Sequence, residues 1–397
     1  MGIKKYALVV LWYVVPLIIL FLTEGVFLPR ATTVVALFVV AFTIGYVTFE
    51  QATFPTFSWS IRDLSYSFFK YLVYIVAIVE LYGIYRIYND GFEIATYRMD
   101  FYESSGGIFK SNYLFTFYSV FLTPGLLLAT IFFLSNNFDK KNKRLIYLCF
   151  FLIVLDGIIR LGRFQYIFVF FFLYLFHSKL GLKKRVLYIG ASIILAISFI
   201  TVYIRQFFVD LAVGGISDII NYEVFRKSVL DYQYVGYFLF EHFTEDRPFF
   251  GNPLECNTIS SLFLILKIFV SKIGINLNYA WEGYNLKLTD GKYIEVLDYQ
   301  YNAFSTNFFP IYLDAGYIGI FLYGLMAGVI FGLKSESIFI KFLQVLNFFM
   351  LIFGIYQPII TSLSGLILIA GYIIVVTVLV KQIKYFVKFQ SKQRLTG

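Results

Sequence analysis

Apolar runs of about 17 to 25 residues recur along nearly the whole sequence, and no other feature constrains the fold as strongly. A helix rises 1.5 Å per residue, so each run is long enough to cross the roughly 30 Å of hydrocarbon in a bilayer. Hydrophobic residues make up 59% of the chain and charged residues only 14%, which is more apolar than a soluble core requires. The sequence therefore predicts an all-α polytopic membrane protein.

The runs predict about ten transmembrane helices. Lys4 and Lys5 precede the first run, but no small-residue cleavage site follows it, so we predict a first span rather than a signal peptide. The ten ranges are 6–22, 31–49, 66–86, 113–134, 145–159, 164–176, 187–204, 308–333, 342–356 and 361–380.

The formal charge of +9 suggests an anionic partner such as nucleic acid, but the basic residues concentrate in short loops and in the C-terminal tail. Their position predicts orientation in a membrane instead of nucleic-acid binding. With the N-terminus inside, these segments all face the cytoplasm, as the positive-inside rule requires, and both termini lie there. The expected location is the inner membrane of a bacterium. The basic residues are Lys140, Lys141, Lys143, Arg144, Lys179, Lys183, Lys184, Arg185, Lys381, Lys384, Lys388, Lys392 and Arg394.

Three parts follow from this topology. Residues 1–204 hold spans one to seven, 205–303 form a large extracytoplasmic loop, and 304–397 hold spans eight to ten with a basic cytoplasmic tail. Because connections of such length are usually functional or separately folded, we predict a small cap with short helices. Within the loop, 261–275 is apolar but carries Lys267 and Lys272. We favour a helix at the membrane interface there, and a further span is the alternative.

Charged residues gather where the fifth and sixth runs meet. Asp156, Arg160 and Arg163 lie at this extracytoplasmic junction, where an arginine costs free energy unless it has a partner or a wet site. Asp156 and Arg160 are four residues apart on one helix, so an intrahelical ion pair is one explanation for Arg160. Arg163 has no such explanation, and for Arg205, which follows the seventh run, snorkelling to the membrane interface is the alternative. Together the three arginines predict a site for phosphate or pyrophosphate.

Proton acceptors occur in the large loop. His242 lies between Glu241 and Glu245, with Arg247 close behind. A histidine or a carboxylate there can serve as a general base, although each is equally explained as a solvated loop residue. The sequence does not choose among the three.

A polar and aromatic stretch leads into the eighth span. Tyr301, Asn307 and Tyr312 carry hydroxyl, amide and aromatic groups that suit sugar binding, although interfacial aromatics are an alternative. Asp314 is a candidate catalytic carboxylate, and an extracytoplasmic arginine is its expected partner. Further on, Gly324, Gly328 and Gly332 repeat at intervals of four residues, which predicts close packing of two helices. 

Several motifs are absent from the sequence. It has no phosphate-binding loop for ATP, no Asp-x-Asp pair for a metal-bound nucleotide sugar and no zinc-binding His-Glu-x-x-His helix. We therefore expect no metal and no cofactor, and we expect the substrate to supply the energy.

The layout resembles that of the bacterial oligosaccharide repeat-unit polymerases, the Wzy-type O-antigen and capsule polymerase family. The topology covers nearly the whole chain. The residues that carry the resemblance are Gly162-Arg163, Arg205, Pro248-Phe-Phe-Gly251 and the stretch from Ser305-Thr306-Asn307 through Asp314-Ala-Gly316 to Gly319. The resemblance implies a glycosyltransferase C-like fold that uses lipid-linked sugar without a metal.

The resemblance further implies block transfer of a growing glycan from undecaprenyl pyrophosphate to a new lipid-linked repeat unit. Arg160, Arg163 and Arg205 would neutralise the pyrophosphate, and His242 or a loop carboxylate would accept the proton. Membrane lipid, a chain-length regulator and a flippase would be further partners. An O-antigen ligase, which is expected to depend on a loop histidine, and a transporter or flippase are the alternatives.

Overall fold

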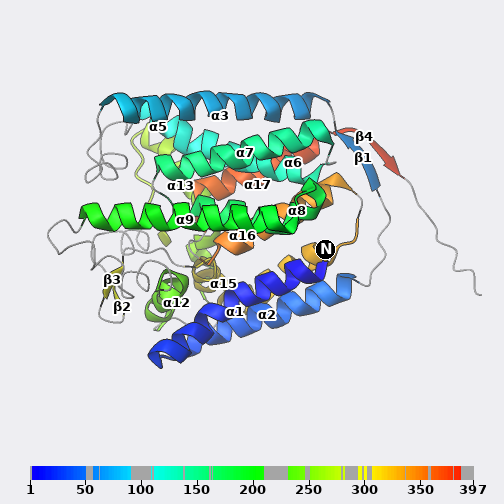
Figure 1. Cartoon of the computed structure of the whole chain (residues 1–397). Coiled ribbons are helices and arrows are strands. Elements are labelled where there is room, and N and C mark those ends of the chain that lie inside the picture. The colour runs from blue at the N-terminus through cyan, green and yellow to red at the C-terminus, as the bar shows by residue number, and fades with distance from the viewer. Residues whose placement is uncertain are drawn as a thin grey trace, which may run out of the picture.

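A computed structural model describes most of the chain, and the described part is mainly helical with two short antiparallel strand pairs. Figure 1 shows the long helices running roughly side by side across the molecule. The described residues are 2–50, 57–61, 63–90, 109, 111–136, 139–160, 162, 164–209, 231–245, 251–278, 280–281, 294–296, 299–301, 306–335, 337–355, 359–378 and 380–385.

A helix occupies each of the ten ranges for which a span was predicted. The fourth range contains a continuous succession of α-helix, π-helix and α-helix, which are α5, η2 and α6. The helices are α1 (Gly2–Glu24), α2 (Pro29–Glu50), α3 (Asp63–Asp90), α5 (Asn112–Phe117), η2 (Tyr118–Leu122), α6 (Thr123–Ser135), α7 (Lys140–Ile159), α8 (Phe164–Leu180), α9 (Lys184–Val209), α15 (Phe308–Gly332), α16 (Ile338–Phe353) and α17 (Leu363–Val378).

Six helical segments of the described chain are long and apolar enough to cross a membrane, so the chain is a helical protein of the multi-pass membrane type. Three further apolar helices are shorter, and the number of ten spans stays a prediction. The six segments are Lys5–Glu24, Pro29–Glu50, Tyr66–Asn89, Asn112–Ser135, Pro253–Ser271 and Phe308–Gly332, and the shorter helices are Phe164–Leu180, Ile338–Phe353 and Leu363–Val375.

The segment Pro253–Ser271 falls within the predicted large loop. It comprises two short 3-10 helices, η4 (Pro253–Glu255) and η5 (Asn257–Ile259), followed by α13 (Ser260–Ser271). α13 contacts α17 and the 3-10 helix η6 (Ile359–Thr361). Length and composition fit the alternative of a further span, and the interfacial helix that we favoured stays a prediction.

The basic loops meet at one end of the helical bundle. The Lys5 ammonium group lies 5.4 Å from the centre of the Phe176 ring at the end of α8. The Lys141 ammonium group lies 5.3 Å from the ring of Tyr66 at the start of α3. Strand β1 (Phe57–Ile61) pairs with β4 (Val380–Tyr385), and Figure 1 shows this pair on the same side as the N-terminus. We call this side the basic end.

The opposite end carries the described parts of the predicted large loop. Figure 1 shows α12 (Asp231–Thr244) and the pair of β2 (Ile294–Val296) and β3 (Tyr299–Tyr301) there. α12 packs against α1, α2 and α15. The Tyr237 hydroxyl donates a hydrogen bond to the Tyr13 carbonyl oxygen at 3.0 Å, and the Tyr237 side chain is fully buried. The helix therefore belongs to the bundle core as much as to a loop.

Glycines bring α2 and α15 into backbone contact along what we call the glycine seam, which confirms the predicted packing of Gly324, Gly328 and Gly332. A Cβ atom at Gly324 would lie 2.6 Å from the Phe38 carbonyl oxygen, and one at Gly332 would lie 2.6 Å from the Tyr46 carbonyl oxygen. Helices in lipid gain little from burying apolar surface against each other, so such close approach supplies the dispersion contacts that hold them together.

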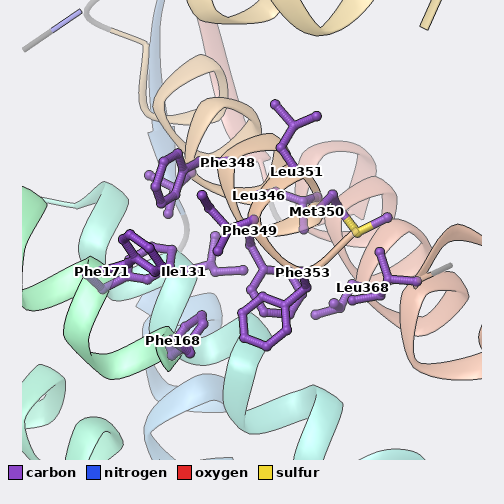
Figure 2. Close-up of a cluster of buried hydrophobic side chains, with 14 of the residues drawn as sticks. Ile131, Phe168, Phe171, Leu346, Phe348, Phe349, Met350, Leu351, Phe353 and Leu368 are labelled. Atoms are coloured by element: carbon purple, nitrogen blue, oxygen red, sulfur yellow. The ribbon is translucent and has the colours of Figure 1, made fainter. Parts of the chain in front are cut away.

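Aromatic and aliphatic side chains fill the space between α6, α8, α16 and α17 (Figure 2). Figure 2 shows this cluster, in which Phe168 lies against the end of α16. The Phe168 ring centre lies 5.4 Å from that of Phe349 and 6.1 Å from that of Phe353. Edge-to-face and tilted pairs of this kind add to the dispersion energy of close packing. The cluster fixes α8, and therefore the junction between α7 and α8, to the body of the protein.

Gly328→Ala is expected to destabilise the protein by about 1 to 3 kcal/mol, because the added methyl group collides with the Phe42 carbonyl oxygen across the glycine seam. The measurement is the thermal unfolding midpoint of the purified protein in detergent. Gly190→Ala in α9 is the matched control. Apart from its two chain neighbours and the nearby backbone of α9, no heavy atom lies within 4 Å of the new methyl group. Equal midpoints for the two variants would show that the glycine seam does not hold the helices together.

Candidate functional site

A charged pair occupies the end of α7, where the sequence predicted an ion pair. The Arg160 Nε atom donates to Asp156 Oδ1 at 2.6 Å, which confirms that prediction. The Arg160 Nη2 atom also donates to Thr123 Oγ1 at 2.8 Å, and the guanidinium carbon lies 4.9 Å from the centre of the Tyr118 ring. The guanidinium is thus held by an opposite charge, a hydroxyl group and an aromatic face.

Asp156 is the centre of this polar cluster. Its side chain is only 2% exposed, so an unpaired carboxylate there would be very unfavourable. Besides Arg160, the Tyr118 hydroxyl donates to Oδ1, and Gln165 Nε2 donates to Oδ2 at 2.9 Å. These donors come from α7 itself, η2 and α8. The carboxylate therefore ties three successive parts of the chain together.

The π-helix η2 shapes one side of the cluster. In its last turn the Thr123 N–H donates to the Tyr118 carbonyl oxygen five residues earlier, which is the spacing of a π-helix. The Thr123 hydroxyl donates to the same carbonyl oxygen at 3.2 Å while its oxygen accepts from Arg160. π-Helical turns inside α-helices occur often at functional sites. This turn aims Tyr118 and Thr123 at the same arginine.

Glu80 on α3 adds a second carboxylate that we did not single out from the sequence. It is 1% exposed, and Asp156, Arg160 and Tyr118 are its charged and polar neighbours. The signal was present, because Glu80 is an acidic residue inside an otherwise apolar run. Five side chains from four helical segments thus form one buried polar cluster, which we call the α7–α8 cluster: Glu80, Tyr118, Asp156, Arg160 and Gln165.

The two other predicted arginines are Arg163, between Arg160 and Gln165 in the sequence, and Arg205. Arg163 lies outside the described residues, directly before the first residue of α8, and Arg205 lies in α9, although the position of its side chain is not described. α8 and α9 are antiparallel neighbours. Counted at 1.5 Å per residue from the turn that joins them, Arg205 lies about 7 Å farther along than the start of α8. Arg205 therefore belongs to the end of the bundle opposite the basic end.

Glu241 has a structural role that the sequence did not reveal. Its carboxylate accepts from the backbone N–H of Arg30 at 3.2 Å and from that of Ala31 at 2.9 Å. These are the first N–H groups of α2, which lack partners within the helix, and the negative charge also suits the helix dipole. In return the Arg30 guanidinium donates to the carbonyl oxygens of Thr244 and Glu245 at the end of α12. Each helix caps the other.

His242 and Glu245 differ from Glu241 in being exposed. The His242 ring makes an edge contact with Phe243, with the ring centres 5.1 Å apart. Of the three proton acceptors predicted in this part of the loop, these two present their side chains to the surroundings. Both stay candidates for a general base.

Asp314 was predicted to pair with an arginine, and its partners among the described side chains are polar groups, so the arginine stays a prediction. Its carboxylate accepts from the Asn257 N–H at 2.7 Å and from the Asn257 side-chain amide at 2.9 Å. It also accepts from the Thr258 N–H at 2.7 Å and from the Thr258 hydroxyl at 2.6 Å. The first N–H groups of a short helix have no partner within the helix, so they are free to donate to a carboxylate. These hydrogen bonds stabilise the charge of Asp314 without an opposite charge beside it.

Gly251 seats the same loop segment on a break in α15. Within α15 Gly316 has φ 56° and ψ −147°, a left-handed conformation that is open chiefly to glycine. A Cβ atom at Gly251 would lie 2.7 Å from the backbone nitrogens of Ala315 and Gly316, so only glycine fits. The Asn252 N–H donates to the Leu313 carbonyl oxygen at 2.6 Å. Two motifs far apart in the sequence, around Gly251 and around Gly316, therefore meet.

Burial does not support substrate binding by Asn307 and Tyr312. Asn307 is fully buried, and its side-chain amide donates to the Met350 carbonyl oxygen at 3.2 Å. Tyr312 is 2% exposed and packs edge-on against Phe240. Tyr301 belongs to β3, although its side chain is not described, and Arg247 lies outside the described residues. The predictions for Tyr301 and Arg247 remain predictions.

No protein-family model, no curated protein and no solved structure matches this chain.

We expect a double-mutant cycle on Asp156→Asn and Arg160→Gln to show coupling of about 0.5 to 3 kcal/mol, because the two groups form a direct ion pair in a buried cluster. Each single change leaves a buried charge without its partner, so each should lower the thermal unfolding midpoint more than a surface substitution does. The double variant should lose less stability than the two single losses combined. Strict additivity would mean that the ion pair is absent in the membrane protein.

A second experiment compares the stabilities of variants at Glu241, which caps α2, and at Glu245, which does not. Glu241→Gln weakens the cap of α2 and should lower stability by about 1 kcal/mol, whereas Glu245→Gln should leave it unchanged, because the side chain of Glu245 is exposed. Thermal unfolding of the two purified variants in the same detergent provides the measurement. A loss of stability in Glu245→Gln alone would contradict the assignment of the cap.

Proposed function

We propose that the protein is a membrane glycosyltransferase that joins lipid-linked oligosaccharide repeat units at the end of the bundle opposite the basic end. The observation that carries the proposal is the α7–α8 cluster, with Asp156 and Arg160 at its centre. Buried charge of this kind is costly in a membrane protein and usually marks a functional site. Under the positive-inside rule, this end would face away from the cytoplasm of a bacterial inner membrane.

The donor would be a glycan on undecaprenyl pyrophosphate. Binding its negatively charged pyrophosphate requires cationic groups at the membrane surface. Arg205 suits that role by its place in α9 at this end, and Arg163 is the second candidate because it directly precedes α8 in the sequence. Guanidinium groups bind pyrophosphate with two hydrogen bonds each and stabilise the charge that develops as it leaves. Arg160 is engaged by Asp156, so in the proposal it is a positioning residue that fixes the end of α7, three residues before Arg163 in the sequence.

The reaction consists of attack by a hydroxyl group of the acceptor sugar on the anomeric carbon of the donor. The new glycosidic bond forms as the bond from that carbon to the pyrophosphate oxygen breaks, and the hydroxyl proton passes to a base. The carboxylates of Glu241 and Asp314 already accept hydrogen bonds from backbone N–H groups, which gives both of them a structural role. We therefore assign the proton to His242 or Glu245, both of which are exposed.

The loop segment that docks on α15 would hold the acceptor. Gly251, Asn257 and Asp314 fix this segment to the break at Gly316, immediately before the long seam with α2. A loop anchored on rigid helices can present sugar-binding groups in a constant geometry. Tyr301 and Arg247 are the predicted sugar-binding residues of this region. A chain-length regulator and a flippase would be the protein partners.

The test uses the purified full-length protein in nanodiscs with lipid-linked repeat units extracted from its source cells, and gel electrophoresis displays the products. Wild type should give a ladder of lengthened glycans. Arg163→Ala and Arg205→Ala should each lower the rate by about 10² to 10³ without changing the protein level, because each removes charge stabilisation of the leaving group. Arg185→Ala is the control, since Arg185 is exposed at the basic end.

Ladders of normal length and rate from both alanine variants would overturn the assignment of the pyrophosphate site. Absence of a ladder from the wild type with competent substrate would favour the ligase or transporter alternatives. Where the wild type gives a ladder, a ladder of normal rate and length from His242→Ala would count against the ligase, which is expected to need a loop histidine. The same result would assign the base to Glu245.

A further inference from the structure

A cavity opens at the basic end, on the side of the bundle away from the α7–α8 cluster. Its volume is about 490 Å³, and it lies where α2, α6, α8 and α15 end and where α1 and α16 begin. Among the described residues, four lysines line it, together with a single acidic residue, Glu50. The lysines are Lys5, Lys179, Lys334 and Lys341.

Two of these lysines share one aromatic ring. The Lys5 ammonium group lies 5.4 Å from the centre of the Phe176 ring, and the Lys179 ammonium group lies 5.8 Å from the same centre. Each contact is favourable by itself, but the two positive charges repel each other across a region of low dielectric constant. An anion between them would turn that repulsion into attraction.

Amide side chains bind backbone carbonyl oxygens at two of the nearby helix ends. Gln344 Nε2 donates to the Ile330 carbonyl oxygen at 3.0 Å and to the Leu333 carbonyl oxygen at 2.7 Å, at the end of α15. Asn136 and Asn142 cap the end of α6 in the same way, through the carbonyl oxygens of Phe132 and Phe133. The helix dipoles offset only part of the lysine charge.

We propose that this cavity binds a phosphate group. Lysine ammonium groups bind phosphate as point charges, and four of them against one carboxylate leave a strong excess of positive charge. The cavity falls within the range of small-molecule sites, roughly 300 to 1,000 Å³, so it accommodates a phosphate with an attached glycerol or sugar. The phosphate belongs either to an anionic phospholipid headgroup or to a soluble phosphorylated compound. The inference is independent of the proposed glycosyl transfer.

The test measures thermal unfolding of the full-length protein in phosphatidylcholine nanodiscs with two probes. Phosphatidylglycerol is added to the bilayer in one series, and glycerol 3-phosphate is added to the buffer in the other. We expect a saturable rise in the unfolding midpoint with one probe or both. The Lys5→Gln/Lys179→Gln double variant should need about thirtyfold more of the same probe, since each lysine near a charged phosphate contributes about a factor of five.

Lys140→Gln/Lys184→Gln is the matched control, because both of these lysines are exposed at the basic end but neither lines the cavity. The control should respond like wild type, and Lys5→Arg/Lys179→Arg should keep most of the affinity. Without a probe, the double glutamine variant should be at least as stable as wild type, because the repulsion over Phe176 is gone.

The probes also identify the source of the phosphate. Saturation by phosphatidylglycerol alone assigns a lipid headgroup, whereas saturation by glycerol 3-phosphate alone assigns a soluble compound, and saturation by both supports a site open to either. No saturable response of the wild type to either probe would overturn the proposal. An equal loss of response in the control pair would overturn it as well, because general surface charge would then explain the effect.

Discussion

Backbone contact between α2 and α15 is the interaction on which most of the described structure depends. Gly324, Gly328 and Gly332 leave no side chain between these helices, so their separation is set by main-chain atoms. Other elements attach to this pair: α12 caps the start of α2 through Glu241, and the loop at Gly251 docks on α15. The position of this helix pair therefore determines where α12 and the Gly251 loop lie, at the end opposite the basic end.

The α7–α8 cluster is a second constraint, and it acts through charge instead of through shape. Asp156 takes hydrogen bonds from Tyr118, Arg160 and Gln165, so its burial is stable only when η2, α7 and α8 are in register. Removing one partner would leave a charge in a medium of low dielectric constant, which is far more costly than removing an apolar contact. This dependence fixes the turn between α7 and α8, where the proposed pyrophosphate site begins.

Local patterns in the sequence predicted the local features of the structure. Run length predicted the helices, and a spacing of four residues predicted the pair of Asp156 and Arg160. The roles of Glu241 and Asp314 escaped prediction because their partners lie 210 and 57 residues away in sequence. No spacing rule links such positions, since the fold alone brings them together. Glu80 was a different case, because its place in an apolar run was a signal that we did not use.

The two ends of the molecule are joined by the same pair of helices. At the basic end, Glu50 of α2 and the residues from Phe331 to Ser335 at the end of α15 line the lysine cavity. At the other end, α2 starts at the Glu241 cap and α15 starts beside Asp314 and its loop. Between these ends, main-chain atoms of α2 and α15 are in direct contact, with no layer of side chains between the two helices. Close packing of this kind makes the helix pair stiff. The cavity and the loops at the far end are therefore built on the two ends of one helix pair, although the two sites share no residue.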